Sequence, residues 1–274
     1  MRSQFEARYG FDPGFAFQLP ENQTLANILG RASCRSFSEQ TIPEGMIEAL
    51  LGVAFSAPSK SDLQQACVIR VTDREKQKRI APRDATSRWV TAAPVMLVWC
   101  GDSRRIRRLC EWRQHPFAND HLDAFFNASV DVGIAMQTFI LAAESVGLRC
   151  CPVSEMRDQI DLLSEELALP QWVFPVAGLC VGWPEKPLEI SMRLPLSVTV
   201  HENTYSDDSM LNDVAAYDRR REAREQTPDS KQRQVEEYGV SEAYGWSEKR
   251  TRQYSKPARE DFGGYIRRQG FNLD

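Results

Sequence analysis

The sequence predicts a mixed α/β domain with an extended C-terminal arm. Three observations favour this fold class. Strand-like apolar segments alternate with helix-like segments through most of the chain. Residues 121–148 form one long segment that lacks proline and is apolar almost all the way round. After His201 the chain becomes polar and charged. Its 274 residues suit one large domain or two small ones, with ample chain for a core.

Helix and strand signals alternate in the N-terminal part. Residues 22–30 and 43–55 read as short helices with proper start and stop residues. Residues 65–73 alternate and are rich in β-branched side chains, which predicts a strand. A polar helix over 74–80 follows. Residues 93–102 form a continuous apolar run, typical of a strand buried on both faces.

The long segment 121–148 is expected to be a helix buried on every side, at a domain centre, a subunit interface or both. Residues 155–168 predict an amphipathic helix, and residues 173–183 and 196–200 predict two further strands.

The polar segment 203–260 has the composition of a disordered tail, apart from its aromatic residues. An arm of helices packed on a partner subunit fits these aromatics better. The residues in question are Tyr205, Tyr217, Tyr238, Tyr244, Trp246 and Tyr254.

Composition excludes several classes of function. A net charge of -4 argues against the strongly basic surface that nucleic-acid binding proteins carry. Charged or amide residues interrupt the apolar stretches, so no membrane span is expected, and the N-terminus lacks a secretory signal pattern, which indicates a cytoplasmic protein. The three histidines lack metal-ligand spacing, and no dinucleotide-binding glycine motif, nucleophile elbow or P-loop occurs.

The seven cysteines include no C-x-x-C pair, and several lie within apolar runs. Reduced thiols in the core are the favoured interpretation, with a strained pair at Cys150–Cys151 as the alternative.

Four polar segments have the composition of ligand-binding loops. The arginines of RASCRSF (31–37) predict an anion clamp, and SAPSKSDLQQ (56–65) offers hydroxyls and amides. In GLRCCPVSEM (147–156), backbone N–H groups at the start of the next helix would face electron-rich atoms. Arg193 precedes a predicted strand. Taken singly, each segment also fits an ordinary connection or surface arginine.

In this order and spacing, the segments resemble the flavin-dependent nitroreductase family, in its NADPH-linked nitroreductase / flavin reductase branch. The resemblance rests on RASCRSF, APSKSDLQQ, DVGIAMQTFILAAESVGL, GLCVGWPE, MRLP and VHENTY, and it persists weakly to the C-terminus. It implies an α+β fold with a mixed central sheet flanked by helices, a long buried dimer-interface helix and an extended C-terminal arm. Residues 1–274 would form a single domain, with a core at about 20–202 and an arm at about 203–274 on the partner subunit.

The resemblance also implies FMN in each of two grooves that both subunits of a homodimer line. Arg35 and Arg193 would clamp the FMN phosphate. The loop formed by residues 56–65, called the serine loop, would reach the flavin of the neighbouring subunit, and amides near Val153 would approach flavin N5. Trp89 would lie near the cofactor. The expected cofactor-binding residues are Arg31, Ala32, Ser33, Cys34, Arg35, Ser59, Lys60, Ser61, Gln64, Trp89, Pro152, Val153, Ser154, Glu155 and Arg193, with no catalytic side chain and no metal.

Three positions depart from the branch. Arg31 stands where histidine is common, Ser154-Glu155 where Gly-Gly is common, and Ser191-Met192 where Lys-Pro is usual. Lys60 would compensate for the lost lysine charge. The arginines that would recognise the 2′-phosphate of the nicotinamide cannot be placed by register; the candidates are Arg219, Arg220, Arg221 and Arg224.

The implied reaction is ping-pong hydride transfer from NADPH (or NADH) through flavin N5 to small-molecule acceptors such as nitroaromatics, quinones or free flavin. Two alternatives stay open. One is a flavin-binding redox sensor with little turnover. The other is a divergent member that cleaves flavin with oxygen or removes halogens.

Overall fold

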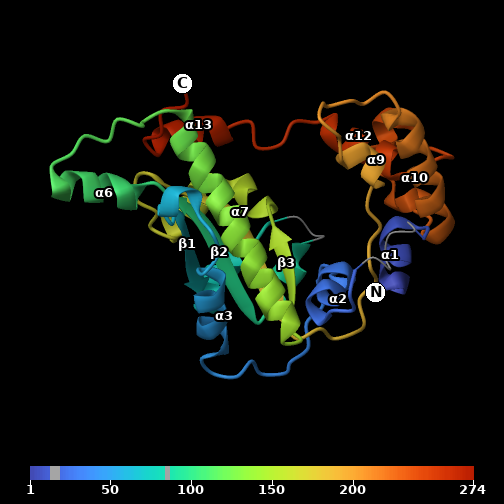
Figure 1. The fold of residues 1–274 in the computed structure, drawn as a ribbon, viewed down its shortest axis with the longest axis horizontal. Coiled ribbons are helices and arrows are strands. Elements are labelled where there is room, and N and C mark those ends of the chain that lie inside the picture. Colours follow the sequence, from blue (N-terminus) through green and yellow to red (C-terminus); the bar gives the residue numbers. More distant parts are fainter. Residues whose placement is uncertain (13–18, 84–86) are drawn as a thin grey trace. The chain divides into compact units, whose positions relative to one another are not determined.

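The computed structural model describes residues 1–12, 19–83 and 87–274, and the chain divides into two compact units (Figure 1). The helical unit comprises Met1–Arg31 and Glu189–Ala258. The sheet unit comprises Ala32–Leu188 and Arg259–Asp274.

The sheet unit is built on four strands in the order β1-β2-β4-β3. Every pairing between these strands is antiparallel, so the described sheet is not the mixed sheet expected from the sequence. Helices connect the strands. The β1–β2 and β3–β4 connections reverse the direction of the chain, whereas β2 and β3 run in the same direction, because both pair antiparallel with β4, which lies between them. The strands are Ala66–Val71 (β1), Val95–Asp102 (β2), Arg149–Val153 (β3) and Val173–Gly182 (β4).

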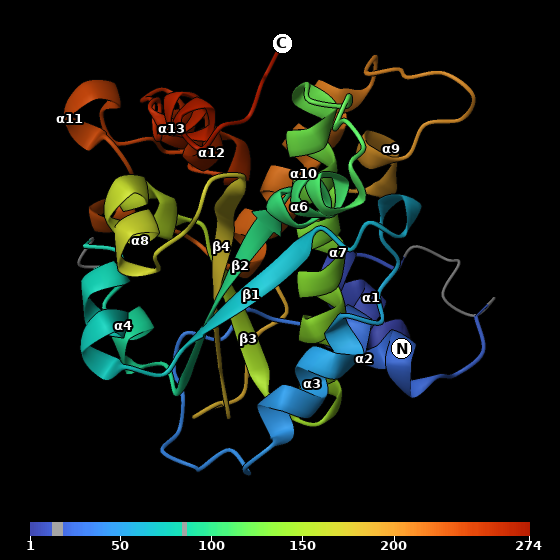
Figure 2. The same cartoon turned by 90° about the vertical axis from the view of Figure 1, so that its left-hand side faces the viewer.

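The two central strands, β2 and β4, are buried along almost their whole length, which confirms the interpretation of their continuous apolar runs. Helices cover both faces of the sheet, as Figure 2 shows, with α3 and α7 on one face and α4 and α8 on the other. The helices of this unit are Met46–Ala54 (α3), Arg74–Ile80 (α4), Trp89–Ala92 (α5), Arg104–Arg113 (α6), Leu122–Ser145 (α7), Ile160–Glu166 (α8) and Phe262–Arg268 (α13).

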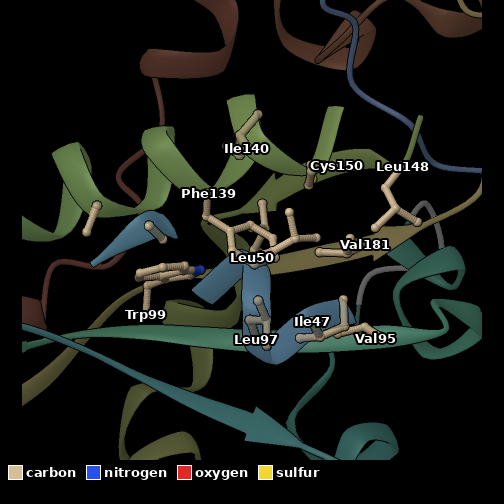
Figure 3. Packing of buried hydrophobic residues seen from close by; sticks show 14 of the residues in the cluster. Ile47, Leu50, Val95, Leu97, Trp99, Phe139, Ile140, Leu148, Cys150 and Val181 are labelled. Carbon is tan, nitrogen blue, oxygen red and sulfur yellow. The ribbon is translucent and has the colours of Figure 1, made fainter. Parts of the chain in front are cut away.

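Helix α7 confirms the long helix predicted from the sequence, and one of its faces packs on the sheet. Phe139 and Ile140 lie among buried residues of β2 and α3, including Trp99 and Leu50 (Figure 3). The rings of Trp99 and Phe139 meet edge to face, with centroids 5.9 Å apart. By length and composition α7 could also cross a membrane, but this packing is that of a core helix.

The other face of α7 is not buried within one chain. Leu122, Phe126 and Val130 are 49%, 59% and 41% exposed. They recur every four residues, so they form one apolar stripe along the helix. The expectation of burial on every side is therefore not met by a single chain.

Two expected elements differ in the structure. The helix expected over 155–168 is divided into a 3₁₀ turn, Glu155–Gln159, and α8, because Gln159 leaves the helical region at φ -126° and ψ 52°. The strand expected over 196–200 is wrong. Residues Leu196–Thr199 form a helical turn, α9, after Pro195, whose fixed φ suits a helix start and whose missing N–H weakens a strand.

The helical unit confirms the expectation of a helical C-terminal region over a disordered tail. Tyr217 is buried and meets the ring of Trp246 edge to face at 5.8 Å, and the Tyr244 hydroxyl accepts a hydrogen bond from the Arg233 amide at 2.8 Å. The helices of this unit are Arg2–Tyr9 (α1), Gln23–Gly30 (α2), Leu196–Thr199 (α9), Met210–Arg224 (α10), Val235–Tyr238 (α11) and Trp246–Tyr254 (α12).

Candidate functional site

A buried carboxylate on α7 holds the serine-rich loop before β1. Asp131 is 3% exposed, and its two oxygens accept hydrogen bonds from the amides of Lys60 at 2.9 Å and Gln65 at 3.1 Å. Bonds from main-chain donors to an ionised carboxylate are charge-assisted and offset the cost of burying it. Asp131 therefore fixes both ends of the loop segment 60–65.

The backbone of this loop is unusual between its two anchors. Ser61, Asp62 and Gln64 have φ values of 50°, 57° and 51°, in the left-handed region that residues other than glycine rarely adopt. The Gln64 amide donates to the Ser59 hydroxyl at 3.1 Å, and the Gln64 side chain donates to Asp62 at 3.2 Å. Lys60, Ser61 and Gln64 are exposed, so the loop presents polar groups to solvent in a defined shape.

The segment after Arg31 runs beside β3 and the end of β4. The Cys34 amide donates to the Cys150 carbonyl at 3.2 Å, and Phe37 forms an isolated antiparallel bridge with Pro184. Ala32 and Cys34 point into the core, which leaves Arg35 exposed. Burial raises the pKa of Cys34, as expected for a core thiol and not for a reactive one.

Arg35 lies close to a second expected site residue. Its guanidinium carbon is 5.8 Å from the ring centroid of Trp89, within the range of a cation–π contact. Two residues before Trp89, the buried Ser87 donates a hydrogen bond to the Glu155 carboxylate. The structure thus links Arg35, Trp89 and Glu155 within the sheet unit. At the end of β3, Pro152 is exposed and Val153 is buried, and Ser154, which follows the strand, is exposed.

These two groups of site residues lie on opposite faces of the sheet. Trp89 packs against the core cluster that includes Ile80 of α4 and Leu163 of α8. The serine loop is held by Asp131, which lies on α7, and most of the buried apolar residues of α7 belong to the cluster on the other face. The β-sheet therefore separates the Arg35–Trp89–Glu155 group from the serine loop.

The helical unit contains a cluster of arginines centred on Arg8. Arg8 is 6% exposed, and its guanidinium donates to the carbonyls of Leu29 and Ser191 at 2.6 Å and of Arg31 at 2.7 Å. Its own carbonyl accepts a hydrogen bond from the Arg193 amide at 2.7 Å. Arg8 thereby joins the backbone segments that carry the expected site residues Arg31 and Arg193.

The charge around Arg8 is predominantly positive. Burial lowers the pKa of Arg8, and the neighbouring guanidinium groups of Arg193, Arg31 and Arg224 lower it further. Ser191, which replaces the usual lysine, accepts a hydrogen bond from Arg193 on its hydroxyl at 2.8 Å. A concentration of guanidinium groups of this kind suits an anion such as a phosphate.

Sequence reasoning missed three residues of these groups. Asp131 had a readable signal, because a lone acid in an apolar helix must be paired when it is buried. Arg8 and Ser87 had none, since both act on segments distant in the sequence. Of the arginines considered for a 2′-phosphate, Arg224 also donates to the Ala7 carbonyl at 2.6 Å and Arg221 to the Tyr217 hydroxyl at 3.0 Å.

Comparison with known proteins gives two consecutive family matches. Residues 28–183 match the model of the nitroreductase family, and residues 191–274 match that of the nitroreductase family C-terminal domain. Among curated proteins, the chain is 32% identical over 201 residues to an FMN reductase [NAD(P)H] of Bacillus subtilis, covering 72% of this chain and 80% of that one. It is 33% identical over 197 residues to an oxygen-insensitive NADPH nitroreductase of Salmonella typhimurium, and this match covers 71% of this chain and 79% of that one.

Among solved structures, the fold is similar to that of an NADPH:FMN oxidoreductase from Vibrio harveyi complexed with NAD⁺. The TM-score is 0.78 at 28% sequence identity, and the match covers 91% of this chain and 98% of that one.

Replacing Asp131 tests the anchoring of the serine loop. The Asp131→Ala variant leaves the amides of Lys60 and Gln65 without their acceptor, and the loss at the buried Gln65 amide alone costs about 1–3 kcal/mol. We expect a lower free energy of unfolding in urea and faster hydrogen exchange at these two amides. Asp123→Ala, at an exposed position on the same helix, is the control. Unchanged exchange at both amides would show that Asp131 does not hold the loop.

Proposed function

Because the chain belongs to the nitroreductase family, we propose that it is a homodimeric FMN-dependent oxidoreductase that takes hydride from NADPH or NADH. Small nitroaromatics, quinones or free flavin would be the acceptors, in a ping-pong sequence. The observation that carries this proposal is the pair of family matches. Between them, residues 28–183 and 191–274 include every residue that the sequence assigns to the cofactor. The expected cytoplasmic location stays a prediction.

The arginine cluster of the helical unit fits the phosphate of FMN. Arg31 and Arg193 would hold it, because Arg8 already fixes their backbone segments and adds positive charge. Arginine suits this role, since its planar fork can donate two parallel hydrogen bonds to a phosphate. Arg35 of the sheet unit is proposed for the same role from its sequence motif, with Ser33 as a further donor.

The chain's own groups would bind and orient the flavin ring. The hydroxyl groups of the half-buried Ser59 and the exposed Ser61 and the amide of Gln64 would contact its polar edge, and backbone amides at Ser154 and Glu155 would approach N5. When bound, FMN supplies the redox chemistry by accepting hydride from the nicotinamide and releasing electrons to the acceptor. Ser87 keeps the Glu155 carboxylate hydrogen-bonded, which offsets part of the cost of placing this charge in a half-buried position.

Two features support a homodimer. The exposed stripe of Leu122, Phe126 and Val130 on α7 is apolar, as protein interfaces commonly are at their centre. In addition, the serine loop and the Arg35–Trp89–Glu155 group lie on opposite faces of one sheet. A flavin that touches both kinds of group would therefore take the serine loop from a neighbouring subunit. We further propose that residues 1–274 act as one domain, whose arm at about 203–274 packs on the partner.

A direct assay tests the activity. We expect the purified protein to bind FMN and to oxidise NADPH or NADH, with the rate increased by nitrofurazone or a quinone. Both substrates should give parallel lines in double-reciprocal plots, as a ping-pong sequence requires. Binding of FMN without turnover would favour a redox sensor instead. Failure to bind FMN at all would refute the proposal.

Substitution of the phosphate-binding arginines tests the cofactor site. Arg193→Ala and Arg35→Ala should each weaken FMN binding by about 1.5–3 kcal/mol, because each removes a charge-assisted hydrogen bond. Fluorescence titration of the apoprotein with FMN measures the dissociation constant. Arg108→Ala removes an exposed arginine on α6 and should leave it unchanged. Wild-type affinity in both test variants would contradict the assignment.

The subunit interface is tested on the apolar stripe. Phe126→Glu places a charge at the middle of the stripe, where desolvation on association is costly. We expect this variant to sediment as a monomer at concentrations at which the wild type is a dimer. Thr72→Glu adds the same charge at an exposed position after β1 and is the control. A Phe126→Glu dimer of wild-type stability would show that the interface lies elsewhere.

A further inference from the structure

The sheet contains two pairs of cysteines that face each other across neighbouring strands. Cys67 of β1 is the register partner of Cys100 of β2, and Cys151 of β3 is that of Cys180 of β4. Directly opposed residues of antiparallel strands have Cα atoms about 4.5–5.5 Å apart. Disulfides span Cα distances of about 4.4–6.8 Å, so either pair could be bridged without a change of register. All four residues are thiols in this structure.

The two pairs differ in access to solvent. Cys67 is partly exposed on β1, which is an edge strand of the described sheet. Cys100, opposite it on β2, is fully buried. Cys151 and Cys180 are 2% and 1% exposed. Only the first pair therefore includes a residue that is partly exposed to solvent.

The two pairs also differ in acidity. The neighbouring Cys100 thiol lowers the pKa of Cys67, although burial opposes this effect, and the Cys67 sulfur together with burial raises the pKa of Cys100 well above its usual value. Burial strongly raises the pKa of Cys180. Because the thiolate is the reactive form and Cys67 is the partly exposed member of its pair, Cys67 is the nucleophile of the first pair.

We propose that Cys67 and Cys100 form a reversible, peroxide-sensitive dithiol site. The Cys67 thiolate attacks one oxygen of hydrogen peroxide, the O–O bond breaks, and hydroxide leaves with formation of a Cys67 sulfenic acid. The Cys100 sulfur then attacks the Cys67 sulfur. The S–S bond forms as the S–O bond breaks, and the thiol proton and the hydroxyl group leave as water. Overall, two thiols are oxidised and one peroxide is reduced to two molecules of water.

This site lies at the base of the serine loop. The Asp102 amide donates to the Gln65 carbonyl at 2.8 Å, and the Ala66–Gly101 pair separates that bond from the cysteine pair. Gln65 is also one of the two residues anchored to Asp131. A disulfide between Cys67 and Cys100 would therefore fix the end of the β1–β2 pair at which the loop joins β1.

Peptide mapping of the full-length protein tests the proposal without reference to flavin. The protein is treated with a small excess of hydrogen peroxide, alkylated and digested. We expect a cross-linked peptide pair containing Cys67 and Cys100, lighter by two hydrogens than the separate peptides, and alkylation of the other five of the seven cysteines. Dithiothreitol should restore both thiols.

Two variants sharpen this test. In Cys100→Ala, Cys67 should still react with peroxide but stop at the sulfenic acid, which a dimedone probe detects. In Cys151→Ala, which removes the buried pair as a matched control, the Cys67–Cys100 cross-link should form at the wild-type rate.

Three outcomes would overturn the proposal. The first is a wild-type protein whose seven thiols all remain alkylatable after peroxide. The second is cross-linking of Cys151 to Cys180 as fast as that of Cys67 to Cys100. The third is irreversible oxidation of Cys67 without a cross-link. All three are read from the wild-type protein, so they do not depend on how well a variant folds.

Discussion

Helix α7 has two apolar faces, and the sheet of its own chain covers only one of them. Phe139 and Ile140 lie in the core, whereas Phe126 and Val130 remain exposed. An exposed apolar stripe on a helix of 24 residues is unfavourable in water, and a second copy of the same helix is a natural means of covering it. The proposed dimer and the proposed composite flavin site both follow from this constraint.

The same helix also determines the shape of the serine loop. Asp131 interrupts the buried side of α7, and a charge in that position requires partners. The partners are the amides of Lys60 and Gln65, and the loop between these two anchors contains left-handed conformations that residues other than glycine rarely adopt. Asp131 thus connects the packing of the core to the conformation of the loop. A substitution in the core that displaced Asp131 would therefore also alter the loop.

Much of the fold could be predicted from the sequence, since burial imposes a local pattern. The apolar runs of β2 and β4 and the long segment of α7 required a covered environment wherever they lay. The direction of the strands could not be read in this way, because parallel and antiparallel strands buried on both faces have the same pattern. The turn at Leu196–Thr199 was also missed, since its alternating, β-branched sequence suits a strand and only Pro195 signals the helical start.

The candidate site was predictable only in part, for a related reason. Arg31, Arg35 and Arg193 stand in motifs that can be recognised locally, but the residue that joins two of them, Arg8, lies in the first helix and acts through main-chain carbonyls. Any residue with the right reach could make such bonds, so no pattern marks the position. Contacts between segments distant in sequence become visible only in the folded chain.

The arginine cluster also carries an energetic consequence for the helical unit. A buried guanidinium surrounded by others is destabilised by desolvation and by repulsion between like charges, and its lowered pKa expresses both effects. An anion bound beside Arg31, Arg193 and Arg224 would offset the repulsion between these like charges. Because it would bind the folded chain and not the unfolded one, occupancy would stabilise this unit in proportion to the logarithm of ligand concentration. Ser191 in place of lysine reduces the positive charge at this position, so the repulsion between like charges in the cluster is smaller than it would be with lysine there.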